Sequence, residues 1–306
     1  MHISLPGRSA SDRRRIRSSL EVVPFLLPGA LLFVIFVFWP MVQGIRVAFY
    51  NWNIMPGAEQ QFVGLDNFRR ALTDPVVRTA FFNTFFYTVV TVPGQMILGM
   101  AVALALNSAI RGKVAWRALY YLPVLTSWVV ASFIFKYLFG GSGAPVNYIF
   151  SDLLHLLPEN VNWLQNRWTA QVPITLLGIW KGIGWNMVMF LAGLQSIPKE
   201  MYEAAAIDGA NRWQTFARIT LPLLRPVLLF VLVMLTIGGF GVGISVQLLT
   251  NGGPMNQTQV LVTYMYDQGF KYFDFGYGAA IAVLLSLILL GLSLVQFKFV
   301  RGKVEV

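Results

Sequence analysis

Six stretches of this sequence run for about 20 residues or more with almost no charged side chain. They cover residues 22–46, 80–106, 117–138, 172–196, 226–248 and 276–298. A helix needs about 20 mostly apolar residues to cross a bilayer, whereas barrel strands are shorter and alternate apolar with polar residues. These stretches do not alternate. The sequence therefore predicts an all-α polytopic membrane protein with six transmembrane helices.

The composition agrees with a membrane protein. Hydrophobic residues make up 56% of the chain and charged residues 12%, whereas soluble domains carry about 25% charged residues. There is no cysteine, which excludes disulfides and thiolate metal ligands, and the two histidines, His2 and His155, lie too far apart to predict a metal site. The first stretch is predicted to be retained rather than cleaved as a signal peptide. Its apolar run is too long, and Trp39 and Pro40 stand where small residues would be needed.

Lysine and arginine are distributed unevenly over the two sides that six crossings define. The N-terminus, the second and fourth connections and the C-terminus hold fifteen of them, counted with the flanking residues, and the other connections hold five. Cytoplasmic loops carry such an excess, so both termini are predicted to be cytoplasmic. The basic run at residues 13–17 is interpreted as a topology anchor on anionic lipid rather than as an arm that binds nucleic acid.

This topology predicts the division of the chain. Residues 1–21 form a basic cytoplasmic arm, 22–50 the first transmembrane helix, 51–78 an extracellular loop, 79–298 a five-span core domain, and 299–306 a cytoplasmic tail. The core includes a polar cytoplasmic segment, 197–225, between the fourth and fifth spans.

That cytoplasmic segment has the pattern of two short helices joined by a glycine corner. Residues 199–208 are good helix formers, and Gly209 can take a positive φ and end a helix there. Asn211, with Gln214 three residues later, predicts a capping box for a second helix. The first helix is expected to expose the small side chains of residues 204–206. An amphipathic connector lying in the lipid headgroups is the alternative interpretation of the pattern.

The same segment resembles the signature of binding-protein-dependent ABC importer permeases. That signature is Glu-Ala-Ala, three residues, Gly, nine residues, Ile, one residue, Leu-Pro. Every specified position is matched, from Glu203-Ala204-Ala205 through Gly209 and Ile219 to Leu221-Pro222. The stretches "LQSIPKEMYEAAAIDGA" (194–210) and "LTNGGPMNQTQVLVTYMYDQGFKYFDFGYGAAIA" (249–282) are similar to the carbohydrate-uptake branch. The N-terminal region resembles the first, maltose/glycerol-phosphate-type permease subunit of such systems.

The resemblance implies a role for the cytoplasmic segment and a set of partners. In the family its first helix couples to an ATPase, and carried over by motif the coupling residues are Glu203, Ala204, Ala205, Asp208 and Gly209. The partners implied are a second permease, two copies of a cytoplasmic ATPase and an extracellular solute-binding protein, in a bacterial or archaeal inner membrane. ATP and Mg would belong to the ATPase. The chain itself is not expected to be an enzyme, because it has no phosphate-binding loop and "IRGKV" (110–114) lacks the required spacing.

Polar side chains inside the spans are candidates for the substrate pathway, because burying them in a membrane is costly. The first group is Lys181, Trp185 and Asn186, which offer hydrogen bonds and an aromatic plate suited to a sugar. Weaker candidates are Asn83 and Gln247. The alternative is that Lys181 reaches the headgroups and Trp185 packs on a neighbouring helix.

The substrate stays open between a sugar, a polyol and a glycerol phosphate. An autonomous secondary transporter or channel is the alternative of another class. It would require ionisable relay residues in several spans, and Lys181 is the one charge clearly inside a span.

Overall fold

The computed structural model describes residues 24–52, 60–108, 110–157 and 159–301. The predicted arm 1–21 lies outside these residues, as does the predicted tail from residue 302 onward. The elements in chain order are η1 Val34–Phe38, α2 Trp39–Val47, β1 Tyr50–Asn51, β2 Gln61–Phe62, α3 Asp66–Thr73, α4 Pro75–Asn107, α5 Lys113–Leu125, α6 Trp128–Leu138, α7 Pro145–Asn147, η2 Tyr148–Leu153, η3 Trp163–Gln165, α8 Arg167–Gln195, α9 Lys199–Ile207, α10 Arg212–Thr215, η4 Phe216–Thr220, α11 Leu221–Leu223, α12 Arg225–Phe240, α13 Ile244–Leu249, α14 Leu261–Tyr266, η5 Asp267–Lys271 and α15 Phe275–Arg301.

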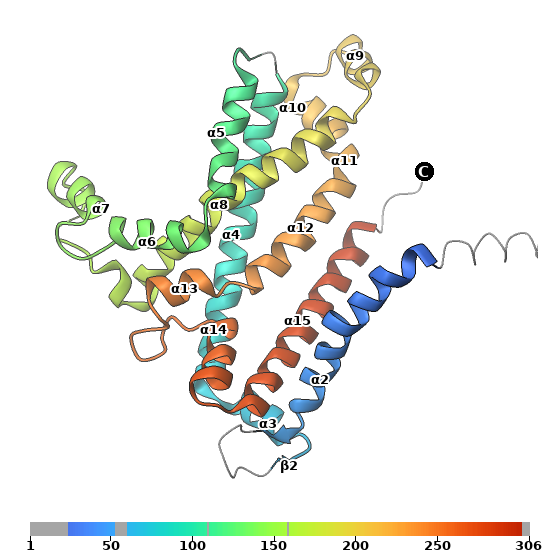
Figure 1. Ribbon diagram of the computed structural model, residues 1–306. Helices are drawn as coiled ribbons and strands as arrows, with labels where there is room; N and C mark the ends of the chain where they lie inside the picture. The colour runs from blue at the N-terminus through green and yellow to red at the C-terminus, as the bar shows by residue number, and fades with distance from the viewer. Residues whose placement is uncertain (1–23, 53–59, 109, 158, 302–306) are drawn as a thin grey trace, which may run out of the picture.

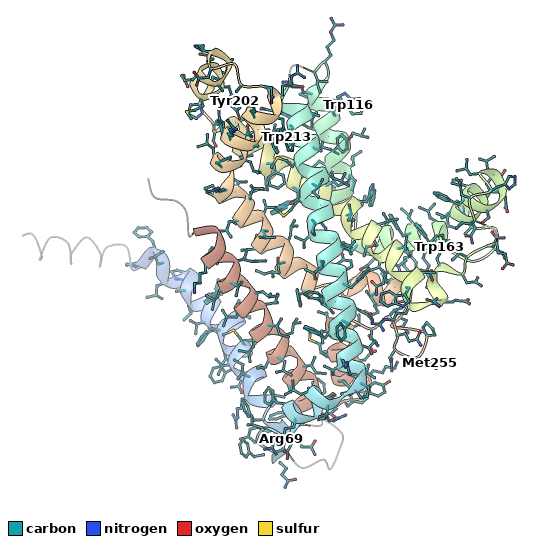
Figure 2. The ribbon with its side chains drawn as sticks, turned by 180° about the vertical axis from the view of Figure 1, so that it is seen from behind. Arg69, Trp116, Trp163, Tyr202, Trp213 and Met255 are labelled. Carbon is teal, nitrogen blue, oxygen red and sulfur yellow. The ribbon has the colours of Figure 1, made fainter. Side chains whose placement is uncertain are left out.

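The helices form an elongated bundle with two distinct ends (Figure 1). α9 and α10 lie at one end, and α3 with β2 lies at the other; we call these the α9 end and the α3 end. Figure 2 shows the same arrangement from behind, with Tyr202 and Trp213 at the α9 end and Arg69 at the α3 end. At the α3 end β1 and β2 form a two-stranded antiparallel sheet in which Tyr50 pairs with Phe62.

Helices of membrane-spanning length and hydropathy confirm the all-α membrane fold. Five are Pro24–Val47, Pro75–Asn107, Arg167–Gln195, Arg225–Leu249 and Phe275–Lys298, and Arg225–Leu249 includes the short break between α12 and α13. The pair α5 and α6 supplies the sixth when it is counted as one span. The first span differs from the others, because no residue of its most apolar stretch is buried inside the protein. It packs on α15 and leaves the rest of its surface open.

The third span is bent, whereas the sequence predicts one straight helix over 117–138. Its two halves meet at 92°, and the chain between them is extended at Thr126 and Ser127. Pro123 lies in the last turn of α5 and removes a backbone donor, and the Ser127 hydroxyl caps α6 by accepting from the Val129 N–H. The predicted span is therefore present as two helices instead of one, and the break follows from this Pro-x-x-Thr-Ser sequence.

Glycines in α8 allow its close contact with α4 and α5. A Cβ added at Gly178 would lie 2.3 Å from the Tyr87 hydroxyl, and one at Gly182 would lie 2.2 Å from the Gln95 side chain. A Cβ at Gly184 would lie 2.2 Å from the backbone oxygen of Tyr120 in α5. Small residues at these positions let the helix backbones approach, which is the usual packing device inside membranes.

Gly184→Ala is expected to lower the unfolding temperature of the detergent-purified protein. The added methyl meets backbone rather than a flexible side chain, so α5 and α8 must separate at a cost of about 1–3 kcal/mol. Gly291→Ala in α15 is the matched control, because nothing lies within 4 Å of its added Cβ. Equal unfolding temperatures for the two variants in a thermal melt would contradict the close contact.

A hydrogen-bonded cluster around Asp74 fastens the α3 end. Its Oδ2 accepts from the hydroxyls of Tyr264 at 2.8 Å and Tyr277 at 2.6 Å, and its Oδ1 accepts from the Val76 N–H at 2.7 Å. These bonds join the start of α4 to α14 and α15. Burial raises the pKa of Asp74, but the hydrogen bonds from Tyr277, Tyr264 and the backbone outweigh it and hold the pKa below its ordinary value of 3.8.

The lowered pKa predicts acid sensitivity at this end. A carboxyl with a depressed folded-state pKa stabilises the fold above its ordinary pKa, and the contribution is lost as the pH falls through the folded value. The unfolding temperature should therefore drop between about pH 5 and pH 2, and Asp74→Asn should drop less over that window. Asp66→Asn, at an exposed carboxylate paired with Arg69, should keep the wild-type profile. If the unfolding temperatures of wild type and Asp74→Asn fell equally over this pH window, the Asp74 carboxyl would not be the cause of the acid sensitivity.

Candidate functional site

The segment between α8 and α12 forms a two-helix elbow at the α9 end, which we define as residues 198–224. α9 begins after Pro198 and ends at Ile207, and Gly209 follows with a φ of 73°. Its corner is closed by the Ala210 N–H, which donates to the Ala205 oxygen at 2.9 Å. A residue with a side chain is disfavoured at this φ, so the sequence turns here because glycine stands here.

The second half of the elbow begins with the predicted capping box. The Asn211 side chain accepts from the Gln214 N–H at 2.8 Å, and the Gln214 side chain accepts from the Asn211 N–H at 2.9 Å. The chain then continues through α10, η4 and α11 into α12. Both backbone N–H groups thus have partners at the start of the helix, which fixes the direction in which it leaves the corner.

The elbow is anchored to both spans that it connects. Leu194 and Ile197 from the end of α8 share a buried cluster with Leu224 at the start of α12, and Tyr202 of α9 packs against it. The Tyr202 hydroxyl also lies 3.3 Å from the Thr220 hydroxyl. Packed side chains, and not only the chain connection, therefore join α9 to the ends of α8 and α12.

The five predicted coupling residues divide between surface and interior. Glu203, Ala204, Asp208 and Gly209 are exposed. Ala205 is only 6% exposed, so the prediction that it presents a small side chain to the outside is wrong. Its backbone oxygen is the one that accepts from the Ala210 N–H at the corner.

Large apolar side chains of the elbow are exposed at the α9 end. Ile207 is 87% exposed and Trp213 73% exposed, and Met201 lies on the same helix as Ile207. Figure 2 labels Trp213 here, beside Tyr202. Apolar residues grouped around exposed charges are typical of a protein-binding surface.

A cavity of about 240 Å³ lies between α4, α5, α6, α8 and α12. Its wall combines aromatic rings with hydrogen-bonding groups. The residues that line it are Tyr87, Thr91, Val92, Gln95, Val124, Trp128, Gly178, Lys181, Gly182, Trp185, Leu235, Gly238 and Gly239. A second cavity of about 250 Å³ shares Tyr87, Trp128 and Gly238 with it and extends along the break between α12 and α13. We call the first one the central cavity.

Lys181 is held at the bend of the third span. Its Nζ donates to the backbone oxygens of Pro123 at 2.9 Å and Thr126 at 2.6 Å, and it lies 4.9 Å from the centre of the Trp128 ring. The side chain is 6% exposed and does not reach for the headgroups. The Nζ also lies 3.5 Å from the Thr126 hydroxyl oxygen, so each of the three donors of the ammonium has a partner at the bend.

The other two residues of the predicted trio occupy different places. Trp185 lines the central cavity and also packs on the core cluster of α8. Asn186 is fully buried and does not line the cavity; its amide donates to the Gly182 oxygen at 2.9 Å and lies 3.4 Å from Gln95 Oε1. Its own Oδ1 is buried without a hydrogen-bond partner.

The weaker candidates Asn83 and Gln247 lie outside the central cavity. Asn83 donates to the backbone oxygens of Gln257 and Gln259, each at 2.8 Å, and accepts from Arg167 Nε at 3.1 Å. It thereby holds the loop before α14 against α4 and α8. Gln247 is an exposed residue of α13.

Comparison with known proteins identifies the family. Residues 78–302 match the family described as binding-protein-dependent transport system inner membrane component. The chain belongs to this family. It is therefore a permease component of an ABC transporter and not an enzyme.

Relatives match the permease over nearly its whole length. It is 39% identical over 292 residues to the arabinooligosaccharides transport system permease protein AraP of Bacillus subtilis (strain 168), covering 94% of this chain and 91% of that protein. It is 37% identical to the inner membrane ABC transporter permease protein YcjO of Escherichia coli (strain K12), covering 94% and 98%. It is 32% identical to the sn-glycerol-3-phosphate transport system permease protein UgpA of Pectobacterium atrosepticum, covering 96% and 99%.

The fold agrees with a solved transporter. A chain from the crystal structure of a bacterial ABC transporter involved in the import of the acidic polysaccharide alginate superposes with a TM-score of 0.80. The match covers 95% of the permease and 99% of that chain at 24% sequence identity. This agreement concerns the arrangement of the helices.

Sequence reasoning missed most of the cavity wall. Tyr87 and Thr91 were missed, although with Gln95, which the sequence does offer as a weak polar candidate, they recur at every fourth position of α4 and mark one polar face on an apolar helix. Trp128 carried no such signal, because it reaches the cavity only through the bend between α5 and α6.

Proposed function

We propose that this permease forms half of the translocation pathway of an ATP-driven importer for a sugar or a related polyol. The observation that carries the proposal is membership of the binding-protein-dependent transport family over residues 78–302. The match with AraP covers nearly the whole chain, and the name of that relative supports an oligosaccharide as the transported class. The central cavity supports it as well, because tryptophan rings accept the apolar faces of sugars while Gln95 and Lys181 address their hydroxyls.

The elbow is proposed as the contact with a cytoplasmic ATPase. Glu203, Ala204, Asp208 and Gly209 would face that subunit, and Ala205 would give α9 its close seat on the elbow. The α9 end is then cytoplasmic, as are both termini, in agreement with the excess of lysine and arginine on that side. ATP and Mg would be bound by the ATPase.

The remaining partners follow from the same proposal. They are a second permease that completes the pathway as a heterodimer, two copies of the ATPase and an extracellular solute-binding protein. The alginate transporter has been solved in complex with an alginate-bound periplasmic protein, which supports such an assembly for this fold. The assembled transporter would alternate between an outward-open and an inward-open state. The elbow would transmit the state of the ATPase to the spans, and the state of the spans to the ATPase.

A glycerol phosphate is the second candidate substrate. The name of UgpA favours it, and so does the presence of Lys181 in the cavity wall. Against it, Lys181 is the one charged residue among the described residues that line the central cavity, and its three donors already have partners in Pro123 and Thr126. A doubly charged phosphate is ordinarily bound by several cationic or backbone donors.

Reconstitution tests the proposal. The permease is expressed with its partner subunits, inserted into vesicles loaded with ATP and supplied with the binding protein and labelled arabino-oligosaccharide or glycerol 3-phosphate. Uptake that requires ATP and the binding protein is expected for the oligosaccharide. Uptake by the permease alone, without ATP, would favour an autonomous transporter. Uptake of glycerol 3-phosphate but not of the oligosaccharide would make the glycerol phosphate the substrate.

A further inference from the structure

Two adjoining cavities at the α3 end differ sharply in polarity. One, of about 530 Å³, is lined by Arg78 and Arg167 together with Leu72, Thr73, Asp74, Pro75, Thr79 and Phe82. The other, of about 350 Å³, lies between α3, α4, α14 and α15 and is lined by apolar side chains apart from Arg78. The two share Leu72 and Arg78, so a charged rim leads directly into an apolar groove.

The two guanidinium groups are available for an anion. Among the residues that the structure describes, neither Arg78 nor Arg167 forms an ion pair, whereas Arg69 pairs with Asp66 and Arg70 with Asp274. Arg167 is positioned by its Nε bond to Asn83 and lies 5.0 Å from the centre of the Trp168 ring, and its terminal nitrogens form no hydrogen bond among the described residues. Asp74 is the one carboxylate in the wall, and both its oxygens already accept hydrogen bonds. Arginine is the side chain best suited to phosphate, because its fork matches the oxygens in pairs.

The groove is lined by residues of two membrane-spanning helices. Phe81 and Val77 come from the first turns of the span that begins at Pro75, and Leu284 and Ile288 come from the middle of the α15 span. A rim with two arginines beside an apolar groove matches a molecule that has an anionic headgroup and an apolar chain.

We propose that this composite site binds an anionic phospholipid. Its phosphate lies between Arg78 and Arg167, and one acyl chain lies in the groove between α4 and α15. The bound lipid would join the start of α4 to α15 next to the Asp74 cluster. Neither the headgroup site nor the acyl groove belongs to the central cavity or to the elbow.

Lipid retention by the purified complex tests the proposal directly. The complex is washed in detergent, incubated with equal amounts of phosphatidylglycerol and phosphatidylcholine, and examined by native mass spectrometry. Wild type is expected to retain phosphatidylglycerol in preference. The double variant Arg78→Gln/Arg167→Gln should lose that retention by roughly tenfold or more, since each lost group is a charge-assisted contact. Arg69→Gln, which removes a nearby exposed charge outside the site, should behave as wild type.

A second variant separates lipid from protein occupants. Val77→Phe narrows the groove and leaves both arginines, and it should weaken phosphatidylglycerol retention while the subunits still co-purify. If Val77→Phe instead releases a subunit and leaves lipid retention unchanged, the groove belongs to another protein chain and the proposal fails. If the double arginine variant weakens docking of the solute-binding protein but retains the lipid, the rim takes an acidic side chain and the proposal also fails. Equal retention of the two lipids by wild type would overturn it outright.

Discussion

Gly209→Leu is expected to abolish ATP-driven uptake while leaving the protein folded and inserted. Gly209 has a φ of 73°, and nothing lies within 4 Å of the position where a Cβ would be. A leucine there strains the backbone by about 1–3 kcal/mol and opens the corner of the elbow. The added side chain also projects from the surface that we assign to the ATPase. Both effects act on the transmission between ATPase and spans rather than on the core.

Gly112→Leu is the matched control for that variant. Gly112 has a φ of 74°, again with nothing within 4 Å of an added Cβ, and it precedes α5 at the same end of the bundle. The backbone strain is therefore the same, and only the location differs. Uptake and co-purification of the ATPase are measured for both. Comparable losses in the two variants, or normal uptake in Gly209→Leu, would remove the elbow from the coupling mechanism.

Lys181→Met is expected to reduce uptake by at least roughly tenfold and to lower the unfolding temperature. The Thr126 oxygen loses its hydrogen bond from Nζ, and an unpaired polar group in the membrane interior costs about 1–3 kcal/mol. The Pro123 oxygen keeps a bond from the Thr126 hydroxyl, so the loss is concentrated at Thr126. The bend between α5 and α6 then loses its tie to α8, and the cavity loses its one charged wall residue.

Lys136→Met provides the comparison for Lys181. The Lys136 Nζ also donates to a backbone oxygen, that of Leu248 at 3.0 Å, but the contact is exposed and lies outside the central cavity. It should leave uptake within about twofold of wild type, as surface contacts contribute little. Uptake is followed as a function of substrate concentration. A lower maximal rate together with a lower unfolding temperature assigns Lys181 to the bend, whereas a change in half-saturation alone assigns it to ligand binding. Wild-type behaviour of Lys181→Met would exclude both roles.

The sequence predicted local and hydropathic features well. Charge-free stretches locate the spans because the interior of a bilayer tolerates only apolar helices. The elbow is predicted by Gly209, which ends the first helix, and by Asn211 and Gln214, which cap the second. What it did not predict are features that depend on three-dimensional neighbours. Pro123 and Ser127 mark the break in the third span, but the sequence does not predict its 92° angle or the contact of Lys181 with the end of α5. The same holds for Trp128, which lines the cavity together with residues of α4. No periodicity within a single helix records either contact.

The candidate pathway residues illustrate the same limit. Lys181 and Trp185 lie one turn apart and both line the cavity, but Asn186, next in the chain, faces the packing between α4 and α8. Asn83 carries the same polar chemistry and instead holds a loop at the α3 end. Amide side chains inside a membrane form hydrogen bonds wherever a carbonyl is within reach, so their presence does not distinguish a pathway from a helix contact.

The first span has a consequence for how the protein is assembled. No residue of its most apolar stretch is buried, and the region that matches the transport family begins only at residue 78. Lipid tails are as apolar as a leucine-rich helix, so exchanging this helix between lipid and protein neighbours changes the free energy little. The buried core therefore comes from the later five spans, and removing the contacts of the first span with α15 would expose no core residue of its own to lipid.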